Sequence, residues 1–77
     1  MDINQFIVSF AGCFDETEAN AFSMDLRFKD LEEWSSLSAL SIIAMCKKKY
    51  GIKITGIEIR EAETILDLYN IVSERVV

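Results

Sequence analysis

The sequence predicts an all-α domain: a small bundle of three main helices plus a short fourth, with a long first loop. Apolar residues recur at helical spacing in three separate segments of the 77-residue chain. Hydrophobic residues make up 51% of the chain and charged residues 27%, a balance that favours a folded core over disorder. Pro is absent and Gly occurs only three times, so no linker is visible and a single domain spanning 1–77 is expected.

The first helix is expected to run from about Ile3 to Phe14. Apolar residues recur there at i, i+3, i+4, i+7 and i+11, which places them on one helical stripe. The polar segment DETEAN then breaks the pattern, and residues 15–34 are expected to form a long, mostly irregular connection. Loops of this length are unusual in small domains. Spaced apolar side chains should pack this one against the core: Phe22, Leu26, Phe28, Leu31 and Trp34.

The most apolar segment predicts a second helix from about Ser36 to Tyr50, which stops at Gly51. Its core side should carry Ala39, Ile42, Ile43, Cys46 and Tyr50. The opposite side carries Leu37, Leu40, Ser41, Ala44 and Lys48. Leucines that face outward beside a helix N-terminus indicate a docking surface. The alternative is that the long loop buries this helix on both sides.

The last third of the chain predicts two further helices. Ile52 and Ile54 should be buried in a connector, and residues 57–62 should form one or two helical turns. Thr64 begins a last helix, with Asp67 at the offset of a capping box. One shared core is expected from Phe6, Phe10, Phe14, Ile42, Ile43, Tyr50, Ile65, Leu68 and Val72.

Ser35 and Ser36 have different expected roles at the start of the second helix. Ser35 is the natural N-cap, because its oxygen can accept a backbone N–H two or three residues on. Ser36 is then the first helical residue, and a phosphate ester on its hydroxyl would lie near unsatisfied N–H groups and the positive end of the helix dipole. Taken alone, the two residues favour the simpler interpretation that both are alternative capping serines, because serine before a helix is common.

Composition narrows the classes of function. The net charge of −5 disfavours nucleic-acid binding, and the longest apolar run, Ala39 to Cys46, is too short to span a membrane. With no His and little room for a cleft, we expect no enzyme activity and no metal site. The N-terminus has no basic region typical of a signal peptide, so a cytoplasmic monomer is expected. Cys13 and Cys46 are expected to be free thiols, although one disulfide is also compatible.

The segment FKDLEEWSSLSALSIIAMCKKKYGIKI resembles the phosphopantetheine attachment region of acyl carrier proteins. Their framework reads Phe-x-Asp-Leu, often a Trp, then Asp-Ser-Leu, an apolar helix, an aromatic residue, Gly and Ile. Downstream, IEIREAETILDLYNIV is similar to the short third helix and the fourth helix of that family. The residues that carry the match are Phe28, Asp30, Leu31, Trp34, Ser36, Leu37, Leu40, Ile42, Ile43, Tyr50, Gly51, Ile52, Thr64, Ile65, Asp67 and Leu68.

The resemblance implies a thioester carrier of fatty-acid or polyketide type rather than a catalyst. Ser36 would bear 4′-phosphopantetheine, transferred from coenzyme A by a phosphopantetheinyl transferase, with Ser35 as the helix cap beside it. An acyl or aminoacyl group would then be held as a thioester and presented to acyl-loading and acyl-transfer enzymes. These partners would meet a surface that we term the docking face: Leu37, Leu40, Ser41, Ala44, Lys47 and Lys48.

The chain also departs from the family pattern. Ser35 stands where the family usually has Asp, and positions that are commonly acidic along the second helix read Ser38, Ser41, Lys47, Lys48 and Lys49. This difference favours a specialised pathway over service with a generic fatty-acid synthase. One alternative is a carrier-like interaction subunit that is never modified. Another is a small helical regulator that binds an acidic partner through the three lysines, although their position favours simple compensation of the negative end of the helix dipole.

Overall fold

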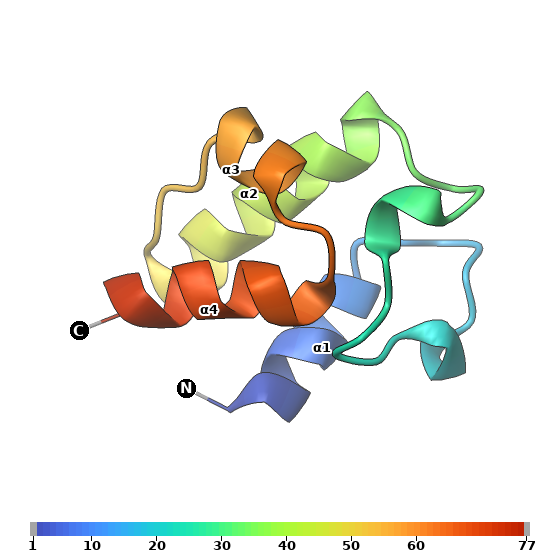
Figure 1. Ribbon diagram of the computed structural model, residues 1–77, viewed down its shortest axis with the longest axis horizontal. Helices are drawn as coiled ribbons and strands as arrows, with labels where there is room; N and C mark the ends of the chain where they lie inside the picture. Colours follow the sequence, from blue (N-terminus) through green and yellow to red (C-terminus); the bar gives the residue numbers. More distant parts are fainter. Residues whose placement is uncertain (1, 77) are drawn as a thin grey trace.

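The computed structural model describes residues 2–76, which fold into helices with no strand in that range (Figure 1). The four α-helices are α1 (Ile3–Ala11), α2 (Ser36–Tyr50), α3 (Gly56–Glu61) and α4 (Ile65–Arg75), and two 3₁₀ turns interrupt the first loop: η1 (Ala19–Ala21) and η2 (Phe28–Asp30). Helix α1 packs against α2 and α4, while the short α3 packs against α2. The predicted bundle of three main helices, a short fourth and a long first loop is therefore confirmed.

Helix α1 ends three residues earlier than predicted. The Asp2 carboxylate caps its start by accepting the backbone N–H of Asn4 at 2.9 Å. At the other end, the N–H of Phe14 donates to the carbonyl of Ala11 at 3.0 Å, in a turn that follows the helix. The Phe14 side chain is nevertheless buried. The apolar stripe overestimated the helix because its last member reaches the core from a turn.

The core centres on a cluster of aromatic rings. The Phe10 side chain is fully buried, and its ring centroid lies 5.2 Å from that of Phe28 and 5.6 Å from that of Phe14. Of the nine residues predicted to form the core, seven are buried, and Ile43 and Tyr50 are partly buried and pack against it. Phe22, Phe28 and Cys46, which were expected to face the core, are buried in the same cluster, and Met45, Ile59 and Ala62 are buried there without having been predicted.

The long connection between α1 and α2 packs against the core, as predicted, and it is also hydrogen-bonded to the rest of the chain. Phe22 and Phe28 are buried within it. The carbonyls of Met24 and Leu26 accept the N–H groups of Leu66 and Ile65 at 2.9 and 3.2 Å. The first turn of a helix leaves such N–H groups without an intrahelical partner. The loop therefore closes the N-terminal end of α4 while its aromatic side chains fill the core.

Side-chain caps fix the two C-terminal helices. Thr55 and Glu58 form a capping box at α3, and Thr64 and Asp67 form the predicted one at α4. The guanidinium of Arg75, in the last turn of α4, donates to the Glu58 carboxylate and lowers the pKa of that group, which also accepts from Thr55. The Arg75–Glu58 pair ties the end of α4 to the first turn of α3.

Candidate functional site

Ser35 and Ser36 have different structural roles, as the sequence predicted: Ser35 is the N-cap of α2 and Ser36 is its first residue. The Ser35 hydroxyl accepts the Ser38 N–H at 3.4 Å, and the Ser38 hydroxyl accepts the Ser35 N–H at 3.2 Å, which completes a capping box. Ser36 is the first residue of the 15-residue helix α2, and its side chain is exposed. Within residues 2–76 the Ser36 hydroxyl makes no hydrogen bond. One serine caps the helix, and the other is free to carry a substituent.

Glu33 fixes the chain immediately before these serines. Its carboxylate accepts the N–H groups of Asp15 and Thr17 at 2.8 and 2.9 Å. It also accepts the Thr17 hydroxyl at 2.8 Å and the Glu16 N–H at 3.1 Å. The Thr17 hydroxyl, followed by these backbone donors, lowers the pKa of Glu33. The start of the loop is thereby bound to the entry of α2, a long-range contact that no local sequence pattern indicates.

A groove of about 430 Å³ opens beside Ser36, between α2 and α3. The Lys29 ammonium crosses it to donate to the Arg60 carbonyl and lies 5.9 Å from the Phe28 ring centroid. A group attached to the Ser36 hydroxyl would begin at the edge of this groove. The lining is mainly apolar, with two basic residues: Lys29, Trp34, Ser35, Ser36, Ala39, Leu40, Ile43, Gly56, Ile59 and Arg60.

The docking face is exposed along its whole length, so the alternative of a helix buried on both sides is wrong. Leu37 is 74% exposed and Leu40 is 60% exposed, and Ser41, Ala44, Lys47 and Lys48 are exposed with them. Ile57 on α3 is 62% exposed and was not included in the predicted face. The three apolar side chains extend the surface from α2 onto α3, where Gly56 and Ile59 line the shared groove.

Ser38 does not belong to the outward surface. Its side chain is buried, and its hydroxyl donates to the Glu33 carbonyl at 3.2 Å in addition to its place in the capping box. The buried residues of α2 are Ser38, Ile42, Met45 and Cys46. The core side is thus rotated by about one residue from the predicted one, because α2 carries apolar residues on two sides and packing selects between them. An acidic residue at position 38 would be used by the cap and not by a partner.

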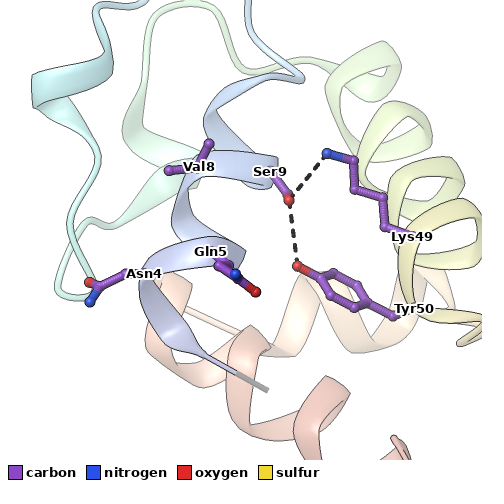
Figure 2. A pocket seen from close by; sticks show the side chains of 6 residues that line it. All are labelled: Asn4, Gln5, Val8, Ser9, Lys49 and Tyr50. Atoms are coloured by element: carbon purple, nitrogen blue, oxygen red, sulfur yellow. Dashed lines mark hydrogen bonds between the residues drawn. The ribbon is translucent and has the colours of Figure 1, made fainter.

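A second groove, of about 580 Å³, lies between α1 and the end of α2 (Figure 2). Figure 2 shows Ser9 at its centre, accepting hydrogen bonds from the Lys49 ammonium at 3.4 Å and the Tyr50 hydroxyl at 3.5 Å. Asn4 and Gln5 line the α1 side. These bonds join α1 to the last turn of α2.

The cysteines are free thiols, as expected. Cys46 is fully buried, and burial, with a smaller contribution from Cys13, raises its pKa to about 11. Cys13 is half-buried, and its pKa is also raised by burial, against a smaller opposing effect of Lys49. The Cys13 thiol donates to the carbonyls of Ser9 and Ser41 at 3.7 Å. Both thiols are held protonated near neutral pH, which is typical of packing rather than nucleophilic cysteines.

In residues 2–76, no His, Cys, Asp and Glu side chains gather in a group that could hold a metal ion. Nor does that part of the chain contain a helix with the length and apolar character needed to cross a membrane. Comparison of the chain with protein-family models, with curated proteins and with solved structures found no match. The functional argument therefore depends on the residues and geometry of the site itself.

Proposed function

We propose that the protein is a carrier that holds an acyl or aminoacyl group as a thioester on a 4′-phosphopantetheine arm attached to Ser36. The observation that carries the proposal is the division of roles at the start of α2. Ser35 satisfies the helix cap, while Ser36 presents an exposed hydroxyl at the first position of a long helix. A phosphodiester there is favoured by the free N–H groups and the positive end of the helix dipole.

The surroundings of Ser36 suit an attached arm. The α2–α3 groove begins at Ser36 and offers an apolar lining to the arm or its acyl group. The Lys29 and Arg60 side chains supply positive charge at the same groove, which would attract the phosphodiester. Leu37 and Leu40 continue outward from Ser36, where a transferase or acyl-transfer enzyme would meet them. In such a carrier the cofactor supplies the reactive thiol, and the chain supplies attachment and presentation.

The test is attachment itself. The purified protein is incubated with coenzyme A and a phosphopantetheinyl transferase of broad specificity, and its intact mass is measured. The phosphopantetheine mass should appear on the wild-type protein and on Ser35→Ala, and it should be absent from Ser36→Ala. Ser35→Ala should lose about 1 kcal/mol of stability with the cap, so its folding is checked by circular dichroism. Modification that depends on Ser35 instead of Ser36 would contradict the assignment.

The second candidate function is an interaction subunit that has the fold and docking face of a carrier but is never modified. The absence of a carboxylate at position 35 and the three lysines in the last turn of α2 favour it. Refusal of the arm by several transferases, in a protein with an intact fold, would support this candidate over the carrier.

The basic residues near α2 also bear on the pathway. The family resemblance implies that the enzymes of a generic fatty-acid synthase bind acidic carriers through basic docking patches. Helix α2 of this protein contains no acidic residue. We propose that the carrier serves a dedicated route, such as the modification of a cell-surface polysaccharide or lipid or a specialised aminoacyl transfer. Loading assays with acyl- and aminoacyl-activating enzymes distinguish these routes.

A further inference from the structure

The two adjoining hollows beside Ser36 are lined by apolar residues and by four cations. Leu40 and Ile43 line both the α2–α3 groove and a neighbouring hollow of about 510 Å³, so the two form a continuous surface. We define the basic rim by the cations that line these two hollows: Lys29, Lys47, Lys53 and Arg60. The rim holds half of the eight Lys and Arg residues of the chain, and none of its 13 Asp and Glu residues line either hollow.

Most rim cations lack a side-chain partner within the protein. Elsewhere Arg27 pairs with Asp30 and Glu63, and Arg75 pairs with Glu58. Within residues 2–76, by contrast, the side chains of Lys47, Lys53 and Arg60 make no ion pair or hydrogen bond. The exposed apolar side chains of Leu37 and Leu40 lie on α2 with Lys47, and that of Ile57 lies on α3 with Arg60. Unpaired cations that line the same hollows as the exposed Leu40 form a surface that a partner can complement with carboxylates and apolar side chains.

We propose that this surface docks an acidic protein partner, whose Asp and Glu side chains surround an apolar centre that packs on Leu37, Leu40 and Ile57. The proposal rests on the proposed function only in taking that partner to be an enzyme that works on the group at Ser36. An amphipathic helix with glutamates flanking its apolar stripe has the required chemistry. Contact of this kind sets association rate and partner choice through charge complementarity.

A protein partner fits the charge distribution better than an anionic membrane does. At physiological ionic strength, charges interact over about 8–10 Å, so a partner of limited size senses the basic rim and little else. A membrane presents an extended negative surface, which also approaches the acidic remainder of a chain whose net charge is −5. The exposed leucines likewise argue against a nucleic-acid backbone, which offers no apolar surface to cover them.

The probes are two designed amphipathic peptides with the same leucine stripe, one flanked by glutamates and the other by lysines. Each is titrated into ¹⁵N-labelled protein that carries Ser36→Ala, so that binding is independent of any modification. The glutamate peptide should bind roughly tenfold more tightly than the lysine peptide, and the advantage should shrink as salt rises. Its chemical-shift changes should centre on Leu37, Leu40 and Ile57.

Two substitutions on α2 form a matched pair for the same titration. Lys47→Glu and Lys49→Glu change the charge equally in the same helical turn, but Lys47 lines the hollow beside Leu40 and Lys49 lines the groove with Ser9. Lys47→Glu should lower the affinity for the glutamate peptide roughly fivefold and raise the affinity for the lysine peptide. Lys49→Glu should change the affinity for either peptide by less than about twofold. The melting temperatures of both variants are measured beside the wild type.

Equal affinity for the two peptides, or equal effects of the two substitutions, would overturn the proposal. So would shift changes centred on Asn4, Gln5 and Lys49. In a parallel assay, the protein is sedimented with vesicles of phosphatidylglycerol and phosphatidylcholine. If the protein binds these vesicles and the titration shows no preference for the glutamate peptide, the rim would be assigned to a membrane instead. Because the titration uses Ser36→Ala protein, its outcome is independent of whether coenzyme A modifies the wild type.

Discussion

Removal of the Phe10 ring tests whether the aromatic cluster holds the loop as well as the helices. The ring is fully buried and lies within 6.3 Å, centroid to centroid, of Phe6, Phe14, Phe22 and Phe28. These partners come from α1, from the loop and from η2. Phe10→Ala therefore removes packing between the first helix and the segment that leads to Ser36.

The expected cost of Phe10→Ala is about 3–5 kcal/mol, the usual range for emptying an aromatic core site. A 77-residue domain has about 4–12 kcal/mol of total stability at the typical value per residue. In a domain of this size each kcal/mol lowers the melting temperature by about 4–8 °C, so the shift should be roughly 12–40 °C. Phe10→Leu, which keeps much of the volume, should cost only about 1–2 kcal/mol and remain folded.

The assay combines thermal unfolding by circular dichroism with the fluorescence of Trp34, the only tryptophan in the chain. The Trp34 ring lies 5.2 Å from Phe28 and 6.3 Å from Phe14, both of which contact Phe10. Val8→Ala is the control on the same helix, because Val8 is 72% exposed and its loss should cost less than about 0.5 kcal/mol. Unchanged melting of Phe10→Ala, or a loss equal to that of Val8→Ala, would refute the assignment of Phe10 to the core.

Three further predictions follow from the loop, the thiols and the surface of α2. Because hydrogen bonds lower the pKa of Glu33 in the folded protein, its contribution to stability should be complete above the usual glutamate pKa and lost as the pH falls through the folded pKa. Glu33→Gln should therefore flatten this part of a curve of stability against pH. A curve identical to that of the wild type would contradict the role of Glu33. Iodoacetamide near pH 8 should alkylate Cys13 before Cys46, as read by peptide mass, because Cys46 is fully buried with a pKa of about 11; equal rates would indicate a more open core. The combined variant Ser35→Asp, Ser41→Glu, Lys47→Glu and Lys48→Glu should accelerate transfer by enzymes with basic docking patches, with a gain that shrinks in salt; rates equal to those of wild type would mean that charge is not read at these positions.

The sequence predicted best what local chemistry determines. The start of α2 at Ser36, its end before Gly51 and the capping box of α4 each depend on residues within one helical turn. Gly51 adopts the left-handed conformation, with φ of 69°, which a C-terminal glycine provides without strain. The exposed docking face was also predictable, because helical periodicity alone places Leu37 and Leu40 away from Ile42.

The features that the sequence did not predict correctly are those that depend on contacts between distant segments of the chain. Helix α1 was overestimated because Phe14 keeps the apolar spacing while its backbone has already left the helix. The core side of α2 was displaced because periodicity cannot decide which of two apolar sides meets α1. The hydrogen bonds of Glu33 to residues 15–17 join segments more than ten positions apart, and the sequence between them gives no sign of the pairing.

The junction before Ser36 is held by more contacts than a surface loop ordinarily needs. Glu33 binds residues 15–17, Trp34 packs on Phe28, and Ser38 anchors the Glu33 carbonyl from inside the helix. Farther back, the loop closes the start of α4 through the carbonyls of Met24 and Leu26. A loop that served only to connect α1 with α2 would gain little from being fixed at both ends. A fixed junction holds the start of α2, and with it the Ser36 hydroxyl, in a constant position against the loop, and a group attached there under the proposed function would be presented from a rigid base.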